Sequence, residues 1–218
     1  MALINYSPPT SPYMDIISQD DDIVVLNKPS GLLSVPGKAK EHADSLQTRV
    51  QRVFPTATVV HRLDMATSGI MVMALNKPAH RHISKQFELR ETAKTYQAIV
   101  FGTVQQDAGE INLPLICDWP NRPKQMVDHE RGKKALTHWR VLERNSHSTR
   151  VELKPVTGRS HQLRVHMLSM QHPIIGDRLY AHDQALSMAN RLNLHAMFLS
   201  FRHPVTEQKL HFESPVPF

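Results

Sequence analysis

Short apolar runs separated by polar turns predict strands along most of this chain. The clearest is the uncharged run 70–75, Ile-Met-Val-Met-Ala-Leu, whose continuous hydrophobicity is typical of a strand buried on both faces. Earlier runs at 16–17 and 23–27 and the pair Val59-Val60 also indicate strands. Further strands are expected near residues 94–100, 111–113, 136–142, 150–153, 193–201 and 209–212.

Three segments have the apolar spacing of helices. The first opens at Ser45, the second has Asn76 as its cap and continues to about Leu89, and the third runs from Ser160 to about Met170. No internal repeat interrupts the order of elements. The pattern therefore predicts an α/β (α+β) fold with a central mixed, mostly antiparallel sheet and flanking helices and loops.

The domain organisation is expected to be simple. The chain has 218 residues, which is enough for one sizeable core but too few for two comfortable domains. Residues 1–12, rich in Ser, Pro and Thr, predict a short N-terminal arm, and residues 13–218 a single domain. No apolar run approaches the roughly 20 residues that span a bilayer, and the N-terminus lacks the pattern of a signal peptide. We expect a cytoplasmic protein without a membrane partner.

The charge balance weakly indicates a nucleic-acid partner. Lys and Arg number 26 against 20 acidic residues, which gives a net charge of +6 and a pI of about 9.6. A domain with a pI above about 9 is a candidate for binding nucleic acid. The single cysteine, Cys117, cannot form an internal disulfide, and we interpret it as a packing residue rather than a nucleophile.

Asp64 lies in a polar stretch, His61-Arg62-Leu63-Asp64, between two apolar strands. Loops positioned by rigid strands often carry catalytic groups, and the nearby Arg62 would favour an ionised carboxylate. An ionised aspartate can act as a nucleophile or a general base. From spacing alone, however, a turn aspartate that hydrogen-bonds its own backbone is the more common explanation.

A second polar cluster covers residues 157–166. With Ser160 as cap, Arg159 and Arg164 would lie near the N-terminus of the third helix, where cations oppose the helix dipole. Their position is explained if an anion, carboxylate or phosphate, lies close by. A solvated basic face is the alternative, and the spacing does not choose between the two. Leu163 falls on the apolar side and is close enough to line a pocket.

Tyr96 and the histidines allow weaker inferences. Tyr96 lies in the predicted strand 94–100 and could stack on an RNA base, although a strand tyrosine more often belongs to the core. No pair of histidines has the spacing of a helical zinc motif, and no glycine-rich phosphate loop is present. We expect neither a metal nor an organic cofactor.

Taken together, three segments resemble the signature segments of the RluA family of pseudouridine synthases. They are residues 61–64, residues 94–98 (Lys-Thr-Tyr-Gln-Ala) and residues 158–166 (Gly-Arg-Ser-His-Gln-Leu-Arg-Val-His). Residues 27–33 resemble the early strand and turn of that family, and residues 116–125 the middle segment of its dual-specificity member. The segments occur in the family's order and cover the chain from about residue 15 to its end.

The resemblance implies a fold, a reaction and a set of site residues. The fold surrounds a basic cleft, and the twelve or so residues before the first strand leave no room for an S4 RNA-binding domain. The reaction breaks the N1–C1′ bond of a uridine, rotates the base and rejoins it through C5, without a cofactor. Asp64 would be the catalytic aspartate, Arg164 its partner, and Tyr96 a catalytic residue packed on the target base.

The resemblance also implies residues that bind the substrate RNA. Leu163 would line the pocket and Arg62 would fill the gap left by the flipped uridine, while the matching motifs add His61, Arg159 and Gln162. The expected partners are a tRNA anticodon stem-loop and a 23S rRNA hairpin, bound by a monomer. Replacing Arg164 with Met is expected to leave folding intact and to lower activity.

Two other functions remain to be separated from this one. A non-catalytic RNA-binding module would use the same basic charge and Tyr96 but would not need Asp64. A metal-dependent nuclease would need carboxylates that converge on a cation, and the acidic cluster at residues 20–22 is the candidate for it. We interpret that cluster as a turn before Ile23.

Overall fold

The computed structural model describes residues 6–218 and divides the chain into two compact units. Among the described residues, the N-terminal unit comprises 6–94 and Ala196–Pro217, and the central unit comprises Thr95–His195 with Phe218. The chain leaves the N-terminal unit inside strand β5 and returns inside strand β11. The division into an arm at residues 1–12 and a single domain at residues 13–218 stays a prediction.

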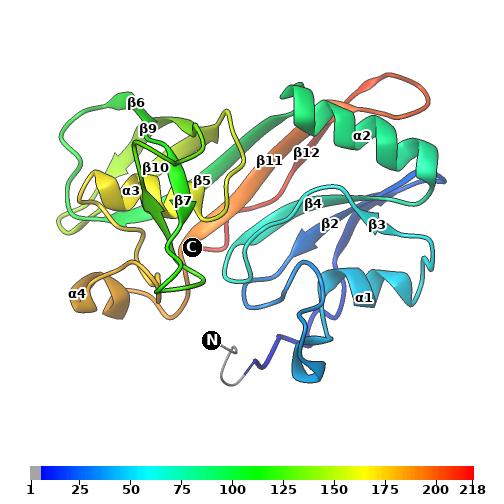
Figure 1. Cartoon of the computed structure of the whole chain (residues 1–218), viewed down its shortest axis with the longest axis horizontal. Coiled ribbons are helices and arrows are strands. Elements are labelled where there is room, and N and C mark those ends of the chain that lie inside the picture. The colour runs from blue at the N-terminus through cyan, green and yellow to red at the C-terminus, as the bar shows by residue number, and fades with distance from the viewer. Residues whose placement is uncertain (1–5) are drawn as a thin grey trace. The chain divides into compact units, whose positions relative to one another are not determined.

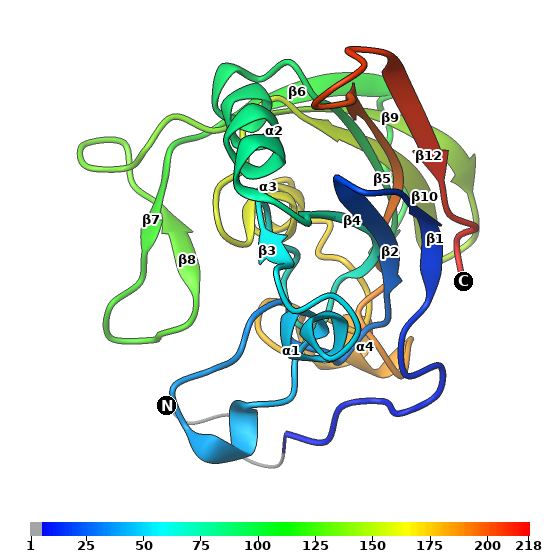
Figure 2. The same ribbon diagram turned by 90° about the vertical axis from the view of Figure 1, so that its right-hand side faces the viewer.

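The N-terminal unit is built on a sheet with the strand order β1-β2-β4-β11, in which β12 pairs with β11 and β3 with β4 (Figure 1; β1 is labelled in Figure 2). Its strands are β1 (Ile16–Gln19), β2 (Ile23–Lys28), β3 (Thr58–Val59), β4 (Ser68–Ala74), β11 (Leu194–Arg202) and β12 (Lys209–Glu213). The helical segments of this unit are η1 (Lys40–His42), α1 (Leu46–Gln51) and α2 (Lys77–Leu89).

Strand β4 is buried along its whole length because helices cover both of its faces. Ile70 and Val72 pack into a core cluster with Ala79 and Ile83 of α2. The alternate residues of β4 point to the opposite face and are also buried. Figure 1 shows α2 and α1 on opposite sides of β2 and β4. The uncharged sequence of β4 is therefore typical of a strand that is buried on both faces.

Helix starts in this unit follow the predicted caps. The Ser45 hydroxyl accepts a hydrogen bond from the Thr48 backbone N–H, and the Thr48 hydroxyl accepts one from the Ser45 backbone N–H, which is a capping box. Asn76 caps α2 by accepting a hydrogen bond from the Ala79 N–H. Both predictions are confirmed.

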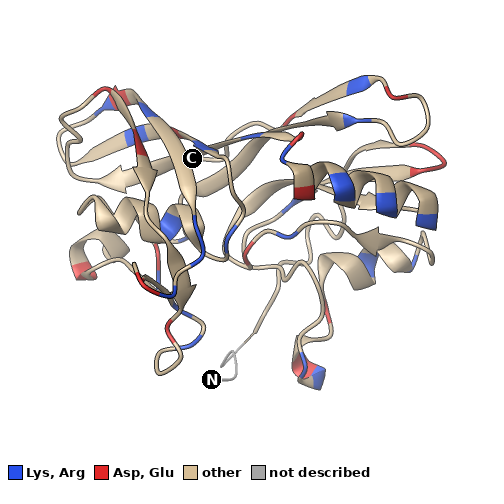
Figure 3. Cartoon of the chain, turned by 45° about the horizontal axis from the view of Figure 1, so that its top comes forward, with Lys and Arg blue, Asp and Glu red and all other residues tan. Residues whose placement is uncertain are grey.

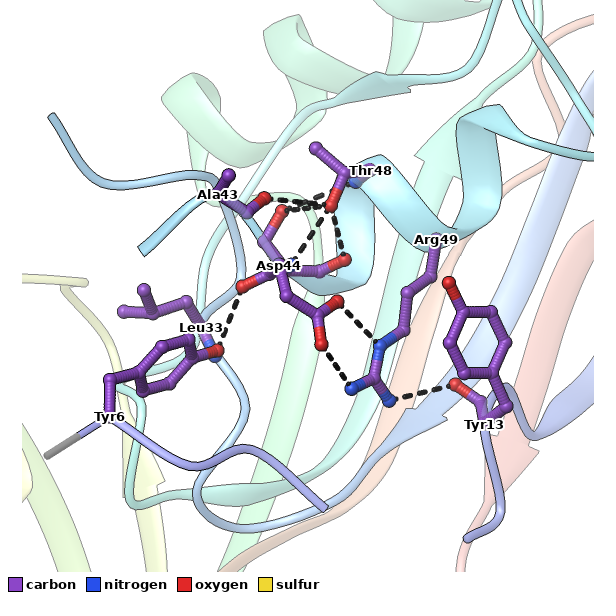
Figure 4. Close-up of polar contacts among 8 residues, drawn as sticks. Tyr6, Tyr13, Leu33, Ala43, Asp44, Thr48 and Arg49 are labelled. Atoms are coloured by element: carbon purple, nitrogen blue, oxygen red, sulfur yellow. Dashed lines mark hydrogen bonds and ion pairs between the residues drawn. The ribbon is translucent and has the colours of Figure 1, made fainter. Parts of the chain in front are cut away.

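The segment after residue 5 is tied to α1 (Figure 4). The Tyr6 hydroxyl donates to the Asp44 carbonyl and accepts from the Leu33 N–H, at 2.8 and 3.0 Å. The buried Arg49 guanidinium binds both carboxylate oxygens of Asp44, at 2.8 and 2.7 Å, and donates to the Tyr13 carbonyl. Of the predicted arm at residues 1–12, residues 1–5 lie outside the described part, and the remainder forms no helix or strand.

The central unit contains the strand order β5-β10-β9-β6 and a separate hairpin, β7-β8. Figure 2 shows this hairpin as a two-stranded ribbon that projects clear of β9 and β10. The strands are β5 (Ala93–Phe101), β6 (Ala108–Asn112), β7 (Leu115–Cys117), β8 (Gln125–Val127), β9 (Leu136–Arg144) and β10 (Ser148–Pro155). The helices are α3 (Gln162–Ser169) and α4 (Asp183–Ser187).

The predicted fold class is confirmed, since both units combine helices with strands that pair antiparallel. Four details differ. The strand expected at residues 111–113 is Ala108–Asn112, the hairpin β7-β8 and helix α4 were not predicted, and α3 begins two residues after Ser160. Within residues 6–218, no helix has the length and apolar character needed to cross a bilayer.

The close contact between β4 and β11 predicts a large effect of substitution at Gly69. This residue has φ +119°, and a Cβ there would lie 2.5 Å from the Ala196 backbone nitrogen. Gly69→Ala should therefore lower the free energy of unfolding by about 2 kcal/mol or more, measured by urea denaturation. Gly158→Ala is the matched control, because a Cβ there meets nothing within 4 Å. Equal stabilities of the two variants would contradict the close packing of β4.

Candidate active site

The loop between β3 and β4 carries Asp64 in the N-terminal unit. The backbone turns directly after Asp64, whose carbonyl accepts a hydrogen bond from the Thr67 N–H at 3.1 Å. The Asp64 side chain is partly buried, Leu63 is buried and Arg62 is exposed. Asp64 thus lies at the start of a turn with a partly shielded side chain, whereas the side chain of Arg62, two positions earlier, is exposed.

Residues 30–34 hold the backbone on both sides of Asp64. The Ser34 hydroxyl donates to the Leu63 carbonyl at 2.6 Å and accepts from the Leu63 N–H at 3.2 Å. On the other side, the Gly31 N–H donates to the Met65 carbonyl at 2.8 Å, and the Ser30 hydroxyl donates to Ala66. These four hydrogen bonds restrain the backbone around Asp64, which positions its carboxylate.

Lys28, at the end of β2, is a buried cation that joins these two segments. Its side chain is 0% exposed, and its ammonium group donates to the carbonyls of Pro29, Leu32 and Met65 at 2.9, 2.7 and 3.1 Å. An ammonium group has three N–H donors, so these carbonyls can replace the water it loses on burial. From the sequence, residues 27–33 were expected only to form an early strand and turn. The signal for this role was a lysine two positions after the fully apolar run 23–26.

His61 attaches the start of the loop to β4 and α2. Its Nε2 accepts a hydrogen bond from the Val72 N–H at 3.0 Å, and its ring stacks on Phe87 with centroids 4.5 Å apart. Burial lowers the pKa of His61 to about 3, and the nearby charge of Lys94 contributes to the same shift. The ring is therefore neutral at physiological pH, as an acceptor of a backbone N–H must be. An RNA contact, as predicted for His61, would have to use another edge of the ring.

The central unit carries the other predicted site residues. Tyr96 lies on β5 opposite Leu153 of β10 and is partly buried. Helix α3 begins after His161, which has φ 53° and provides no side-chain cap, so the predicted Ser160 cap is wrong. Arg159 precedes the helix, is exposed, and donates through Nε to the Lys134 carbonyl at 3.1 Å.

The side-chain amide of Gln162 makes four hydrogen bonds around the start of α3. Its amide oxygen accepts from the Thr157 hydroxyl and the Arg159 N–H, at 2.7 and 3.0 Å. Its amide nitrogen donates to the Leu136 carbonyl and the Thr137 hydroxyl, both at 3.0 Å. With 3% of the residue exposed, Gln162 uses its amide to connect α3 with β9. This arrangement favours a scaffolding role over the RNA contact expected from its motif.

Arg164 forms a buried ion pair with Asp177. Its Nε and one terminal nitrogen bind the two carboxylate oxygens at 2.8 and 2.7 Å, and the side chains are 5% and 1% exposed. The guanidinium also lies 5.0 Å from the centre of the Tyr180 ring. Asp177 was not predicted as a site residue, because an aspartate after Gly176 is typical of an ordinary turn. The anion expected near Arg164 is thus present within the central unit.

The predicted site residues are divided between the two units. Leu163 is buried, while Asp64, Arg62 and His61 belong to the N-terminal unit and Tyr96, Arg159 and Arg164 to the central one. A guanidinium presents five N–H donors, so pairing with Asp177 is compatible with a second acceptor at Arg164. The predicted pairing of Arg164 with Asp64 stays a proposal.

The acidic cluster at residues 20–22 is a turn, as predicted. One Asp20 oxygen accepts from the N–H groups of Asp22 and Ile23, at 2.8 and 2.9 Å, and the other lies 3.1 Å from His203 Nε2. Ligand atoms of Asp20, Asp22 and His203 lie within 4.8 Å of one another. Hydrogen bonds within the chain account for this grouping, and exposed acidic groups of this kind are common without a metal.

The lowered pKa of His61 predicts a pH dependence of stability. As pH falls below about 6.5, the unfolded chain binds a proton at His61 that the folded protein does not bind until about pH 3. The stabilising effect of the neutral ring is therefore lost progressively between these values. The difference in urea midpoint between wild type and His61→Gln should shrink from about pH 7.5 to about pH 4.5. His129→Gln, at an exposed histidine, is the control, and a constant difference for His61→Gln would contradict this prediction.

The ion pair revises the expectation that Arg164→Met folds normally. This change leaves the Asp177 carboxylate buried without its cation, which should lower the free energy of unfolding by about 3–5 kcal/mol in urea titrations. Adding Asp177→Asn removes the buried charge and should restore part of the loss. Arg140→Met, which breaks an exposed pair with Glu152, should have a much smaller effect. A fully stable Arg164→Met protein would refute the structural importance of the pair.

Comparison with known proteins agrees with this geometry. The family model described as RNA pseudouridylate synthase matches residues 22–169, which include residues of both units. The dual-specificity RNA pseudouridine synthases RluA of Pasteurella multocida and Escherichia coli are 54% and 55% identical to the chain, over 100% of both chains in each case. The structure of human RNA pseudouridylate synthase domain containing 1 superposes with a TM-score of 0.81 at 29% identity, covering 97% of this chain and 87% of that one.

A second human structure extends the similarity. RNA pseudouridylate synthase domain containing 4 superposes with a TM-score of 0.75 at 26% identity, covering 93% of this chain and 88% of that one. The loop of Asp64, strand β5 with Tyr96, and the start of α3 all lie within the matched residues 22–169. The chain therefore belongs to the RNA pseudouridylate synthase family, whose members convert uridine in RNA to pseudouridine.

Proposed function

We propose that this protein is a dual-specificity pseudouridine synthase that modifies uridines in a tRNA anticodon stem-loop and in a 23S rRNA hairpin. The observation that carries the proposal is full-length similarity, at 54–55% identity, to enzymes named for dual specificity. The restrained loop of Asp64 supports it, because a reacting carboxylate must be held in a defined position. The protein is proposed to act as a cytoplasmic monomer without a metal or an organic cofactor.

Asp64 is the proposed catalytic residue. The reaction breaks the N1–C1′ bond, and an ionised carboxylate can promote this by attacking the sugar or by removing a proton from it. In either case the base leaves, rotates and rejoins the sugar through C5, and the C5 proton is released. Arg164, paired with Asp64 in this proposal, would favour the ionised carboxylate because an opposite charge stabilises it.

The remaining residues are proposed to bind the target uridine. The base must leave its stack before the sugar can react, which costs a few kcal/mol. Arg62, exposed on the same loop as Asp64, would occupy the vacated space. Tyr96 would pack on the extruded base and take part in the late proton removal. Leu163 would supply an apolar wall, while Arg159, and His61 through its remaining edge, would contact the RNA.

Basic side chains on both units supply an electrostatic footprint for RNA. On α2, Lys77, Arg81 and Lys85 are exposed and four residues apart, so they share one face of the helix. Figure 3 shows Lys and Arg along this helix. None of the three forms an ion pair within residues 6–218, and repulsion among them lowers helix stability. Such a stripe suits phosphates, and RNA binding should weaken steeply with salt.

Release of tritium from uridine C5 tests the proposed reaction. Transcripts of a tRNA anticodon stem-loop and of the rRNA hairpin are incubated with the purified protein and a chelator. The wild type should release tritium from both RNAs, and Asp64→Asn should be slower by at least about 100-fold because the amide is neither nucleophile nor base. Asp21→Asn, at an exposed aspartate near the strand β2, is the matched control and should be fully active.

The alternatives predict other results. Tight RNA binding without tritium release by the wild type would favour a non-catalytic RNA-binding module. Loss of activity with chelator would contradict a reaction without a metal. Release from one RNA alone would retain the isomerase and reject dual specificity.

A further inference from the structure

Trp119, in the central unit, has no role in the proposed reaction. It lies in the loop that joins β7 to β8, and 64% of the residue is exposed, whereas the other tryptophan, Trp139, is 4% exposed. An exposed indole leaves a large apolar area in water, which is unfavourable unless a partner covers it. Tryptophan on a surface is accordingly enriched where partners bind.

The loop is ordered without help from the indole ring. Backbone hydrogen bonds close it from Asp118 N–H to the Lys124 carbonyl and from Lys124 N–H to the Asn121 carbonyl, each at 3.0 Å. Asn121 also donates to the Asp118 carboxylate at 2.9 Å, and Arg122 donates through Nε to the Trp119 carbonyl at 3.2 Å. The indole is therefore held on a preformed loop, and its removal should not unfold the hairpin.

The hairpin is anchored to the part of the central unit that carries Arg164. Leu115 of β7 packs with Val165 of α3 in a core cluster, against which Val127 and Tyr180 also pack. The Tyr180 hydroxyl accepts a hydrogen bond from the Gln125 N–H at 2.7 Å, and its ring lies under the Arg164 guanidinium. The loop of Trp119 thus has a defined position relative to Arg164 within this unit.

The charges around Trp119 favour an anionic partner with a planar group. The Arg122 guanidinium carbon lies 4.5 Å from the indole centre, which places a cation on the ring. Lys133 pairs through its backbone with Leu115, so the exposed Lys133 and Lys134 lie at the base of the hairpin, at the other end of β7 from the loop of Trp119. Among the acidic residues of this segment, the Asp118 carboxylate accepts a hydrogen bond from Asn121 and the Asp128 carboxylate accepts one from Arg131. Glu130 is exposed.

We propose that Trp119 and Arg122 form a stacking platform for an unpaired nucleobase of the substrate RNA, outside the pocket of the target uridine. The proposal rests on the proposed function, since the substrate hairpins present unpaired loop bases. Bases stack on aromatic side chains whatever their identity, and phosphates favour the adjacent cations. The platform selects RNAs in which a loop base lies at the required distance from the target uridine.

Binding measurements test the platform directly. They use Asp64→Asn protein, which holds the RNA without turnover, and a fluorescein-labelled tRNA anticodon stem-loop at fixed salt. Trp119→Ala should raise the Kd by about tenfold, the usual effect of removing one stacked base. Trp119→Phe keeps an aromatic ring and should recover most of the lost affinity. Leu142→Ala, at another exposed apolar residue of the central unit, should bind like the parent. Equal thermal midpoints of these proteins establish that the loss is not due to unfolding.

Replacement of single loop nucleotides by abasic ones then identifies the stacked base. At one position, the abasic RNA should bind about as weakly as Trp119→Ala does, and combining the two changes should give no further loss. Parent affinity in Trp119→Ala, or additive losses at every loop position, would overturn the proposal. Failure of the proposed function is a separate result, in which the wild type releases no tritium while Trp119→Ala still weakens binding.

Discussion

The loop of Asp64 depends on a buried lysine. Lys28 ends an apolar strand, and three backbone carbonyls, including that of Met65, surround its ammonium group. A buried cation without such partners would be very unfavourable, so the turn after β2 and the loop after β3 must come together. Once they do, Ser30, Gly31 and Ser34 can bond the backbone on either side of Asp64. The position of the carboxylate proposed to be catalytic thus follows from the solvation of one charge.

The central unit also contains a buried cation, which is stabilised by a different kind of partner. Arg164 is also buried, but its partner is the carboxylate of Asp177, bound through two oxygens. Carbonyls suit the compact ammonium, whereas a planar guanidinium matches the two oxygens of a carboxylate. Around this pair, Gln162 joins α3 to β9 and Tyr180 joins α3 to the β7-β8 hairpin. A change at Arg164 is therefore expected to affect folding as well as the part that this residue is proposed to play in the reaction.

Elements with strong local signals were predictable, and those with weak signals were not. Ser45 and Asn76 cap helices through their own side chains, and β4 is a continuous apolar run, so residues close in sequence were sufficient. The hairpin β7-β8 has strands of three residues each, which are too short for an alternating pattern to stand out. Ser160 looked like a cap, but the chain enters α3 through His161 in a left-handed conformation.

By itself, the sequence determined the fold class, the family and the residues proposed for chemistry, because motifs and apolar periodicity depend on order along the chain. The tertiary structure decided which polar residues form hydrogen bonds within the protein and so stabilise the fold. Gln162 and His61 stood in motifs expected to bind RNA, yet their hydrogen bonds go to Leu136, Thr137 and Val72. Asp177, thirteen residues beyond Arg164, became its partner. Such pairings follow from burial, since a polar group removed from water must find its partners wherever the fold places them.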